Sequence, residues 1–167
     1  MKKINKNIVL IGMPGCGKTT TGKILSQKIK LKLYDLDECI EKSTGKTIKE
    51  LFSKSEKVFR DAESKITEQI SSTYPKIIST GGGIVKRENN IHALKKNGII
   101  IFINRPIEDI ISDINTNTRP LLKDGKEKLY KLYDERIELY KKYCDIEIIN
   151  DETIEKTIKS IIEALSI

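Results

Sequence analysis

The sequence predicts an α/β fold, a three-layer α/β/α sandwich on a five-stranded parallel sheet. Short apolar runs typical of buried parallel strands alternate with longer segments of helical periodicity. A glycine-rich stretch, 12–20, joins the first apolar run to the first helical segment. The sequence contains no internal repeat, low-complexity block or linker, so we expect a single domain over residues 1–167.

The expected strands are apolar runs of the length and composition of buried strands. The most apolar is Ile-Ile-Ile-Phe-Ile at 99–103, which should be buried on both faces. Another strand ends in two acidic residues, Asp35 and Asp37, which should lie on one face of the strand, while Leu36 between them lies on the opposite face and can pack. The five expected strands are 8–11, 31–37, 76–80, 99–103 and 146–149.

The expected helices have apolar residues at spacings of three and four. On the helix that ends near residue 71, Arg60 and Glu63 share a different face and can pair. The only histidine, His92, is interpreted as a surface or packing residue. The expected helices are 18–29, 38–43, 47–52, about 53–71, 88–97, 106–114, 126–143 and 153–165.

Short-range signals set several boundaries. Ser53 and Glu56 fit a capping box that opens the long fourth helix. Gly98 fits a left-handed stop after the fifth helix, and Asp151 fits the cap of the last one. A polar stretch without apolar periodicity predicts a lid over about 112–125.

Composition limits the partners. Lysine and arginine exceed the acids by 31 to 24, a net charge of +7, but the lysines are spread out and aromatics are few, so we expect no nucleic-acid partner. No apolar run approaches a membrane span, which predicts no membrane partner. The three cysteines have no metal-site spacing and the chain shows no export signal, so we expect a cytoplasmic protein, and a monomer.

Residues 12–20, Gly-Met-Pro-Gly-Cys-Gly-Lys-Thr-Thr, match the phosphate-binding pattern G-x-x-x-x-G-K-[ST], with an apolar strand before it and a helix after it. The backbone N–H groups of this loop and the positive N-terminal end of the following helix can bind phosphate. Lys18 should reach the β- and γ-phosphates, and the Thr19 hydroxyl should ligate Mg²⁺, with Asp35 holding the ion through water. The expected ATP contacts are Gly12, Pro14, Gly15, Cys16, Gly17, Lys18, Thr19 and Thr20, where the Cys16 side chain is a small packing group.

Other features should meet this P-loop at one sheet edge. Three glycines at a strand end, Gly81, Gly82 and Gly83, indicate backbone that approaches a ligand closely. Arginines suit carboxylate recognition by paired hydrogen bonds. An ATP site facing a carboxylate site describes a kinase for an anionic, hydroxylated metabolite, with Asp37 accepting from the substrate hydroxyl. The arginines come from three segments: Arg60, Arg119 and Arg136.

The chain resembles shikimate kinase, a P-loop enzyme of the nucleoside-monophosphate-kinase type, over essentially its whole length. The resemblance is carried by GMPGCGKTT, the pair Asp35 and Asp37, Phe59-Arg60 with Glu63, Ser79-Thr80-Gly81-Gly82-Gly83, Arg119-Pro120-Leu121-Leu122, and Arg136 before Tyr140. It implies phosphorylation of the shikimate 3-hydroxyl by ATP with Mg²⁺, in aromatic amino-acid (chorismate) synthesis.

The resemblance also implies residue roles. Arg60 and Arg136 would take the shikimate carboxylate, Gly82 would contact the ring, and Asp37 would take its hydroxyls, within a substrate region at about 35–62. Arg119 would come in with the lid onto the phosphates, and with Lys18 and Mg²⁺ it would offset charge during transfer. Many family members carry a second, adenine-stacking arginine early in the lid, which residues 111–118 lack.

Alternatives remain open from the residues. Another small kinase, for gluconate or a nucleoside monophosphate, shares this architecture, and a non-catalytic ATP-binding or nucleic-acid-binding regulator would need only the P-loop. Arg60 and Glu63 fit a solvated helix pair. Arg136 fits a snorkelling surface residue, and Asp37 fits a cap on the following helix.

Overall fold

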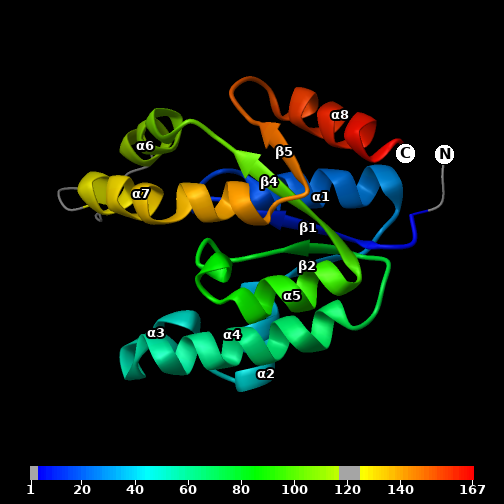
Figure 1. The fold of residues 1–167 in the computed structure, drawn as a ribbon. Helices are drawn as coiled ribbons and strands as arrows, with labels where there is room; N and C mark the ends of the chain where they lie inside the picture. Colours follow the sequence, from blue (N-terminus) through cyan, green and yellow to red (C-terminus); the bar gives the residue numbers. More distant parts are fainter. Residues whose placement is uncertain (1–3, 117–124) are drawn as a thin grey trace.

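The computed structural model describes residues 4–116 and 125–167. Within these ranges, five parallel strands form one sheet in the order β2-β3-β1-β4-β5 (Figure 1). Val9 at its centre is paired with Ile78 on one side and Ile100 on the other. The expected five-stranded parallel sheet is confirmed. Its strands are β1 (Asn7–Ile11), β2 (Leu33–Asp35), β3 (Ile77–Ser79), β4 (Gly98–Asn104) and β5 (Ile146–Ile149).

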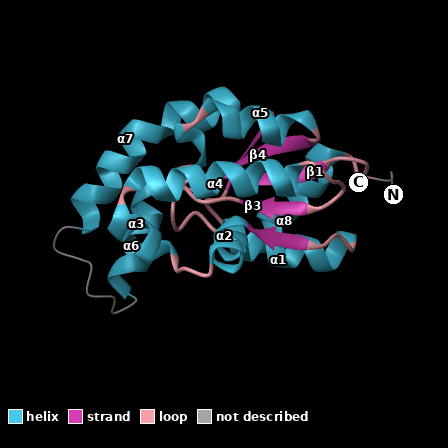
Figure 2. Ribbon diagram, turned by 90° about the horizontal axis from the view of Figure 1, so that it is seen from below, coloured by secondary structure: helices cyan, strands magenta, loops and turns pink. Residues whose placement is uncertain are grey.

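Helices cover both faces of the sheet. Helices α1 and α8 pack together on one face, and α5, with α4 against it, lies on the other (Figures 1 and 2). The three-layer architecture is therefore as expected. The described helices are α1 (Lys18–Ile29), α2 (Leu36–Thr44), α3 (Ile48–Lys54), α4 (Glu56–Ser71), α5 (Glu88–Lys96), α6 (Ile107–Thr116), α7 (Gly125–Tyr143) and α8 (Ile154–Leu165), with a 3₁₀ turn η1 (Ile84–Lys86).

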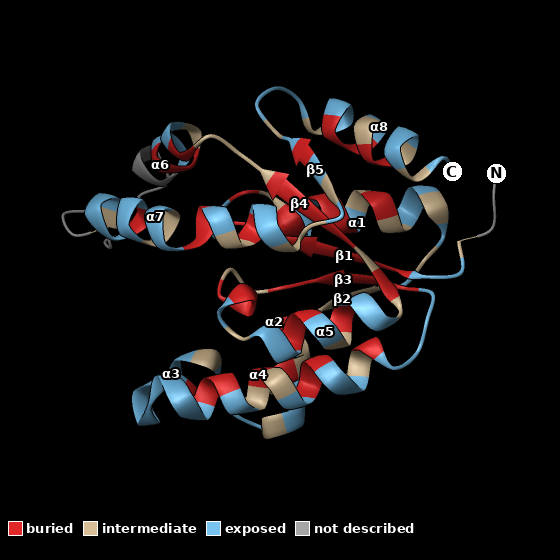
Figure 3. Cartoon of the chain, in the orientation of Figure 1, coloured by how far each residue is buried: buried red, intermediate tan, exposed pale blue. Residues whose placement is uncertain are grey.

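The core is centred on β1 and β4. Residues 8–11 are fully buried, and so are Ile100, Ile101 and Ile103 (Figure 3). Both strands lie inside the sheet between two helical layers, and this explains their continuous apolar sequences. His92 is exposed on α5, as expected. Across the described ranges, no helix is long and apolar enough to cross a membrane.

The strand expected at 31–37 is shorter than predicted. It ends at Asp35, and Leu36 and Asp37 already belong to α2. The Asp35 carboxylate accepts hydrogen bonds from the amides of Asp37 (3.0 Å) and Glu38 (3.3 Å), so Asp35 is the N-cap of this helix. Asp37 is therefore not the cap, and Leu36 is buried as expected.

The capping box expected at Ser53 and Glu56 is wrong. Ser55 caps α4 by accepting from the Val58 amide, whereas the Ser53 hydroxyl donates to the Glu50 carbonyl. The same short-range pattern does form a capping box six residues earlier, at the start of α3, with Thr47 and Glu50.

Two further boundary predictions are wrong. Gly98 is the first residue of β4 and not the stop of α5, and a Cβ at this position would lie 2.6 Å from the Leu94 carbonyl oxygen. Close packing of a strand on a helix end therefore explains this glycine. Thr153, not Asp151, caps α8 by accepting from the Lys156 amide.

Much of the expected lid, including Arg119, lies outside the described residues. On its two sides α6 continues to Thr116, beyond the expected end at 114, and α7 begins at Gly125.

Candidate active site

The P-loop joins β1 to α1, and its backbone requires glycine. Gly12, Gly15 and Gly17 have φ angles of 148°, 81° and 99°, in the region that side chains disfavour. A Cβ on Gly12 would also lie 2.6 Å from the Ile103 carbonyl oxygen. Cys16 is fully buried, which confirms that its side chain is a packing group. The loop can therefore keep its amides close to a bound anion.

Lys18 starts α1 and turns back over the loop. Its ammonium group donates to the carbonyls of Gly12 (2.8 Å) and Met13 (2.9 Å), and the residue is buried. A cavity of about 710 Å³ opens above it. This cavity, called here the phosphate cavity, is lined by Pro14, Gly15, Gly17, Lys18, Thr19, Thr20, Asp35, Asp37, Thr80, Gly81, Gly82, Arg105, Ile110 and Asp113.

Thr19 and Asp35 lie together at this cavity. The Thr19 hydroxyl donates to Asp35 Oδ2 at 3.1 Å and lies 3.4 Å from the Ser79 hydroxyl. Hard oxygen donors beside a phosphate cradle fit Mg²⁺, which keeps several waters and takes few protein ligands. The described residues contain no cluster of three or more His, Cys, Asp or Glu that could hold a metal ion.

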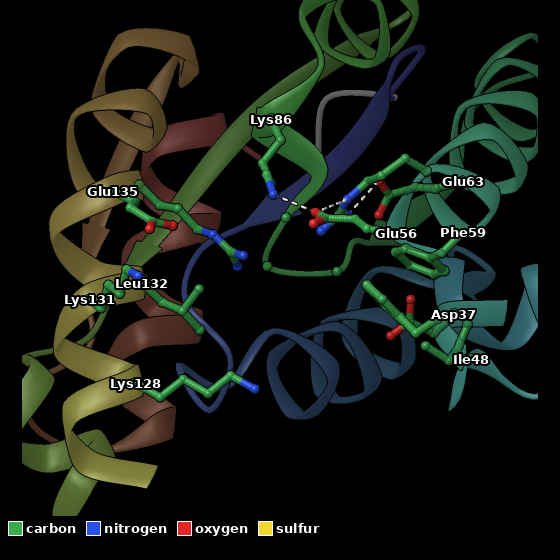
Figure 4. Close-up of a pocket in the computed structure, with 16 residues that line it drawn as sticks. Asp37, Ile48, Glu56, Phe59, Glu63, Lys86, Lys128, Lys131, Leu132 and Glu135 are labelled. Carbon is green, nitrogen blue, oxygen red and sulfur yellow. Dashed lines mark hydrogen bonds and ion pairs between the residues drawn. The ribbon is translucent and has the colours of Figure 1, made fainter. Parts of the chain in front are cut away.

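A second cavity of about 610 Å³ adjoins the first, and we call it the arginine cavity. Figure 4 shows Asp37 and Glu63 on one side and Lys128, Lys131 and Glu135 of α7 on the opposite side. Asp37, Gly81 and Gly82 line both cavities. The arginine cavity is lined by Asp37, Ile48, Phe52, Glu56, Phe59, Arg60, Glu63, Gly81, Gly82, Gly83, Lys86, Lys128, Lys131, Leu132, Glu135 and Arg136.

Arg60 is clamped in the wall of the arginine cavity. Nη1 donates to Glu63 Oε1 at 2.8 Å, Nε donates to Glu56 Oε1 at 3.3 Å, and the guanidinium lies over the Phe59 ring. Glu63 is fully buried, which confirms the expected pair and excludes a solvated surface pair. Burial raises the pKa of Glu63, and the Arg60 charge opposes that shift.

Gly83 makes room for the Arg60 guanidinium. A Cβ at Gly83 would lie 2.2 Å from Nη2, and Glu63 leaves the guanidinium little freedom to move. We expect Gly83→Ala to raise the KM for an anionic substrate of the arginine cavity about 10- to 100-fold, because the arginine must shift, while ADP affinity stays near that of the unchanged protein. Steady-state kinetics and an ADP titration measure both; an unchanged KM would contradict the prediction.

Asp37 lies where the two cavities meet. Its Oδ1 is buried and has no hydrogen-bond partner among the described residues. Burial, followed by the Asp35 charge, raises the pKa of Asp37, and Lys18 and Arg60 oppose the shift. An acceptor oxygen without a partner at this junction suits a ligand hydroxyl.

Arg136 faces the arginine cavity from α7. It is 8% exposed, so it is not a snorkelling surface residue, and its Nε has no partner within the described ranges. One turn later, the Tyr140 hydroxyl donates to the Gly82 carbonyl at 2.5 Å, and this bond ties α7 to the triple glycine. Burial raises the pKa of Tyr140, which keeps its hydroxyl a donor. The structure thus brings Arg60 and Arg136 to one cavity.

Two residues at the same sheet edge were not predicted. Arg105 follows β4 and lines the phosphate cavity, and Asn150 follows β5 and donates to the Cys16 carbonyl at 3.0 Å. Thr157 of α8 donates to the Asn150 side chain at 2.9 Å and holds it in place. The signal that led to Asp35, a polar residue directly after a strand, also applies to both.

A shikimate kinase family model matches residues 14–166. A shikimate kinase of Clostridium botulinum (strain Eklund 17B / Type B) is 49% identical over 158 residues, which cover 95% of this chain and 96% of the relative. A solved shikimate kinase from Acinetobacter baumannii in complex with shikimate is 30% identical, with a TM-score of 0.86 and coverage of 96% and 93%. One from Aquifex aeolicus is 33% identical, with a TM-score of 0.83 and coverage of 96% for both chains.

Proposed function

This chain belongs to the shikimate kinase family, and on that premise we propose that it transfers the γ-phosphoryl group of ATP to the 3-hydroxyl of shikimate, a step of aromatic amino-acid (chorismate) synthesis. The observation that carries the proposal is the wall shared by the two cavities, made by Asp37, Gly81 and Gly82. A nucleotide held by the P-loop and an acid held by arginines would meet over Asp37.

The arginine cavity supplies the acceptor site. Arg60 and Arg136 bind the shikimate carboxylate by paired, charge-assisted hydrogen bonds, and both are already buried at the wall. Gly81, Gly82 and Gly83 contribute backbone to this cavity, and the Cβ that each lacks would lie against Asp37, Pro14 and Arg60 respectively. A neutral sugar has no carboxylate and would not need two arginines to bind one. The pair of arginines therefore favours an acidic substrate.

Asp37 orients the hydroxyl that attacks. Its unpartnered Oδ1 accepts the hydrogen bond of the 3-hydroxyl and can take its proton as the new P–O bond forms. Lys18 balances the charge on the β- and γ-phosphates, and we assign Arg119 the same role, although it lies outside the described residues. Catalysis then consists mainly of positioning and charge balance.

Thr19 and Asp35 are the residues that would hold Mg²⁺, Thr19 directly and Asp35 through water. When bound, the ion neutralises charge on the phosphate oxygens. In this arrangement the Thr19–Asp35 hydrogen bond places both oxygens on the same side of the P-loop.

We also propose that the chain acts as a single kinase domain over residues 1–167, as a cytoplasmic monomer without nucleic-acid or membrane partners.

A coupled assay of ADP release tests the function. With ATP and Mg²⁺, we expect turnover with shikimate and only background with gluconate or nucleoside monophosphates. Turnover with another acceptor and not with shikimate would overturn the substrate assignment. ADP binding without turnover on any acceptor would instead indicate a non-catalytic nucleotide-binding protein.

A further inference from the structure

Arg105 lies in the connection between β4 and α6, next to the P-loop. Its Nη1 donates to the Gly15 carbonyl at 3.2 Å and to Asp113 Oδ2 at 2.6 Å. The side chain is 23% exposed, so it is mostly enclosed at the edge of the phosphate cavity. Gly15 belongs to the loop expected to wrap the phosphates, so the guanidinium lies against this loop and in the wall of the phosphate cavity.

The charges of this cavity favour a role for Arg105 in anion binding. Among the described residues that line it, the basic side chains are Lys18 and Arg105, whereas Asp35, Asp37 and Asp113 are acidic. The three carboxylates repel a bound polyphosphate, and each cation in the same wall offsets part of this repulsion. The two cations contact different parts of the P-loop. Lys18 donates to the carbonyls of Gly12 and Met13, and Arg105 donates to the carbonyl of Gly15.

The geometry of the side chain also fits. The two hydrogen bonds of Arg105 to described residues both use Nη1, whereas a guanidinium carries five N–H donors in a planar fork. The fork can therefore contact Asp113 and the P-loop and still donate to an oxyanion. The pair with Asp113, which lies on α6, keeps the guanidinium at the cavity edge and not in bulk solvent.

We propose that Arg105 is a nucleotide-binding residue that donates to the phosphate chain of ATP or ADP. This deepens the ATP site and rests on the proposed function. A merely structural Arg105 would support the Gly15 carbonyl and contact no ligand. Neither role affects the arginine cavity, which does not contain Arg105. The two roles differ in the ligand-free protein, because removal of a structural arginine would lower its melting temperature and removal of a phosphate contact would not.

The test is isothermal titration of ADP–Mg²⁺ and, separately, of shikimate into the unchanged protein, Arg105→Met and Arg105→Lys. The matched control is Arg87→Met, whose arginine is paired with Asp61 at 2.9 Å outside both cavities. We expect Arg105→Met to weaken ADP binding about 10-fold or more. Arg105→Lys should lose less, since it keeps the charge without the fork, and shikimate affinity should stay within about twofold in all variants.

ADP affinity of Arg105→Met within about twofold of the Arg87→Met control would overturn the proposal. So would weaker ADP binding together with a melting temperature of ligand-free Arg105→Met below that of Arg87→Met, which would indicate that the arginine only supports the P-loop. An equal loss for ADP and shikimate would also overturn it, because it would indicate disrupted packing beyond the phosphate cavity. If Arg105→Met fails to fold, Arg105→Gln, which removes the charge but stays polar, replaces it in the same comparison. Failure of the proposed function is distinguishable, because it would appear in the unchanged protein as ADP binding without shikimate phosphorylation.

Discussion

Asp37→Asn is expected to lower the turnover number with shikimate by about 10²- to 10⁴-fold while ADP affinity stays within about twofold. The amide has nearly the same shape but cannot take a proton, and it replaces the carboxylate whose Oδ1 lies buried between the two cavities. Steady-state kinetics with saturating ATP and an ADP titration measure the two quantities. Glu38→Gln is the matched control, because Glu38 is the exposed next residue of α2. Turnover retained in Asp37→Asn would remove Asp37 from the mechanism.

The same variant has an expected effect on stability. Burial and Asp35 raise the pKa of Asp37, so the folded state holds this proton more tightly than the unfolded chain does. The pKa of such a carboxyl is higher in the folded state than in the unfolded state. The free energy of unfolding therefore falls as the pH rises from the unfolded-state pKa through the folded-state pKa. At pH 7 the ligand-free Asp37→Asn protein should therefore melt at a higher temperature than the unchanged protein. A lower melting temperature in thermal unfolding at pH 7 would contradict this.

Arg136→Met should raise the KM for shikimate about 100-fold and leave ADP affinity within about twofold. Methionine keeps much of the apolar stem of arginine and removes the guanidinium that would bind the carboxylate. No salt bridge to Arg136 occurs within the described ranges, so its removal leaves no buried acid unpaired there. Arg60 is different, because Glu63 would lose its partner, and for this reason Arg136 gives the cleaner measurement.

The control for Arg136→Met lies on the same helix. Lys141 is half-exposed on α7 and paired with Glu138, so Lys141→Met changes the helix without touching either cavity. We expect wild-type kinetics from it. Equal losses of shikimate and ADP affinity in Arg136→Met would show that the arginine acts through the packing of α7 rather than on the ligand.

Much of the fold could be predicted from the sequence because its signals are local. The run at 99–103 is apolar on both faces, and β4 lies between helical layers as that pattern requires. The P-loop is specified by glycines, and three of these have positive φ angles. Helix α1 was predicted with its observed bounds, since the motif and the periodicity agree there.

Boundaries failed where two local signals compete. Thr47 with Glu50 and Ser53 with Glu56 have the same capping-box spacing, but only the first is used, because α4 starts after Ser55. Gly98 fits a helix stop in sequence, whereas its real constraint is the close approach of the Leu94 carbonyl from α5. Tertiary packing decides which of two competing local signals is used, and a short stretch of sequence gives no information on that packing.

The sequence predicted which residues form the site better than it predicted how they are arranged. The spacing of Arg60 and Glu63 indicates a possible pair, but their burial comes from α4 packing under the triple glycine, which no local pattern reports. Asp35 and Asp37 were placed on one strand, although the cap that Asp35 forms puts them on different elements. Arg105 has no motif around it, and only the sheet order brings it beside β1.

The wall common to both cavities has a consequence for inhibitor design. Among the described residues, Asp37, Gly81 and Gly82 line both cavities, and two of these three lack side chains. A bisubstrate compound, an acidic ring tethered to a polyphosphate mimic, would need only a short linker to reach both ends. Once one end is seated, the other experiences a millimolar effective concentration, so the tethered compound should bind about 10²- to 10⁴-fold more tightly than either half.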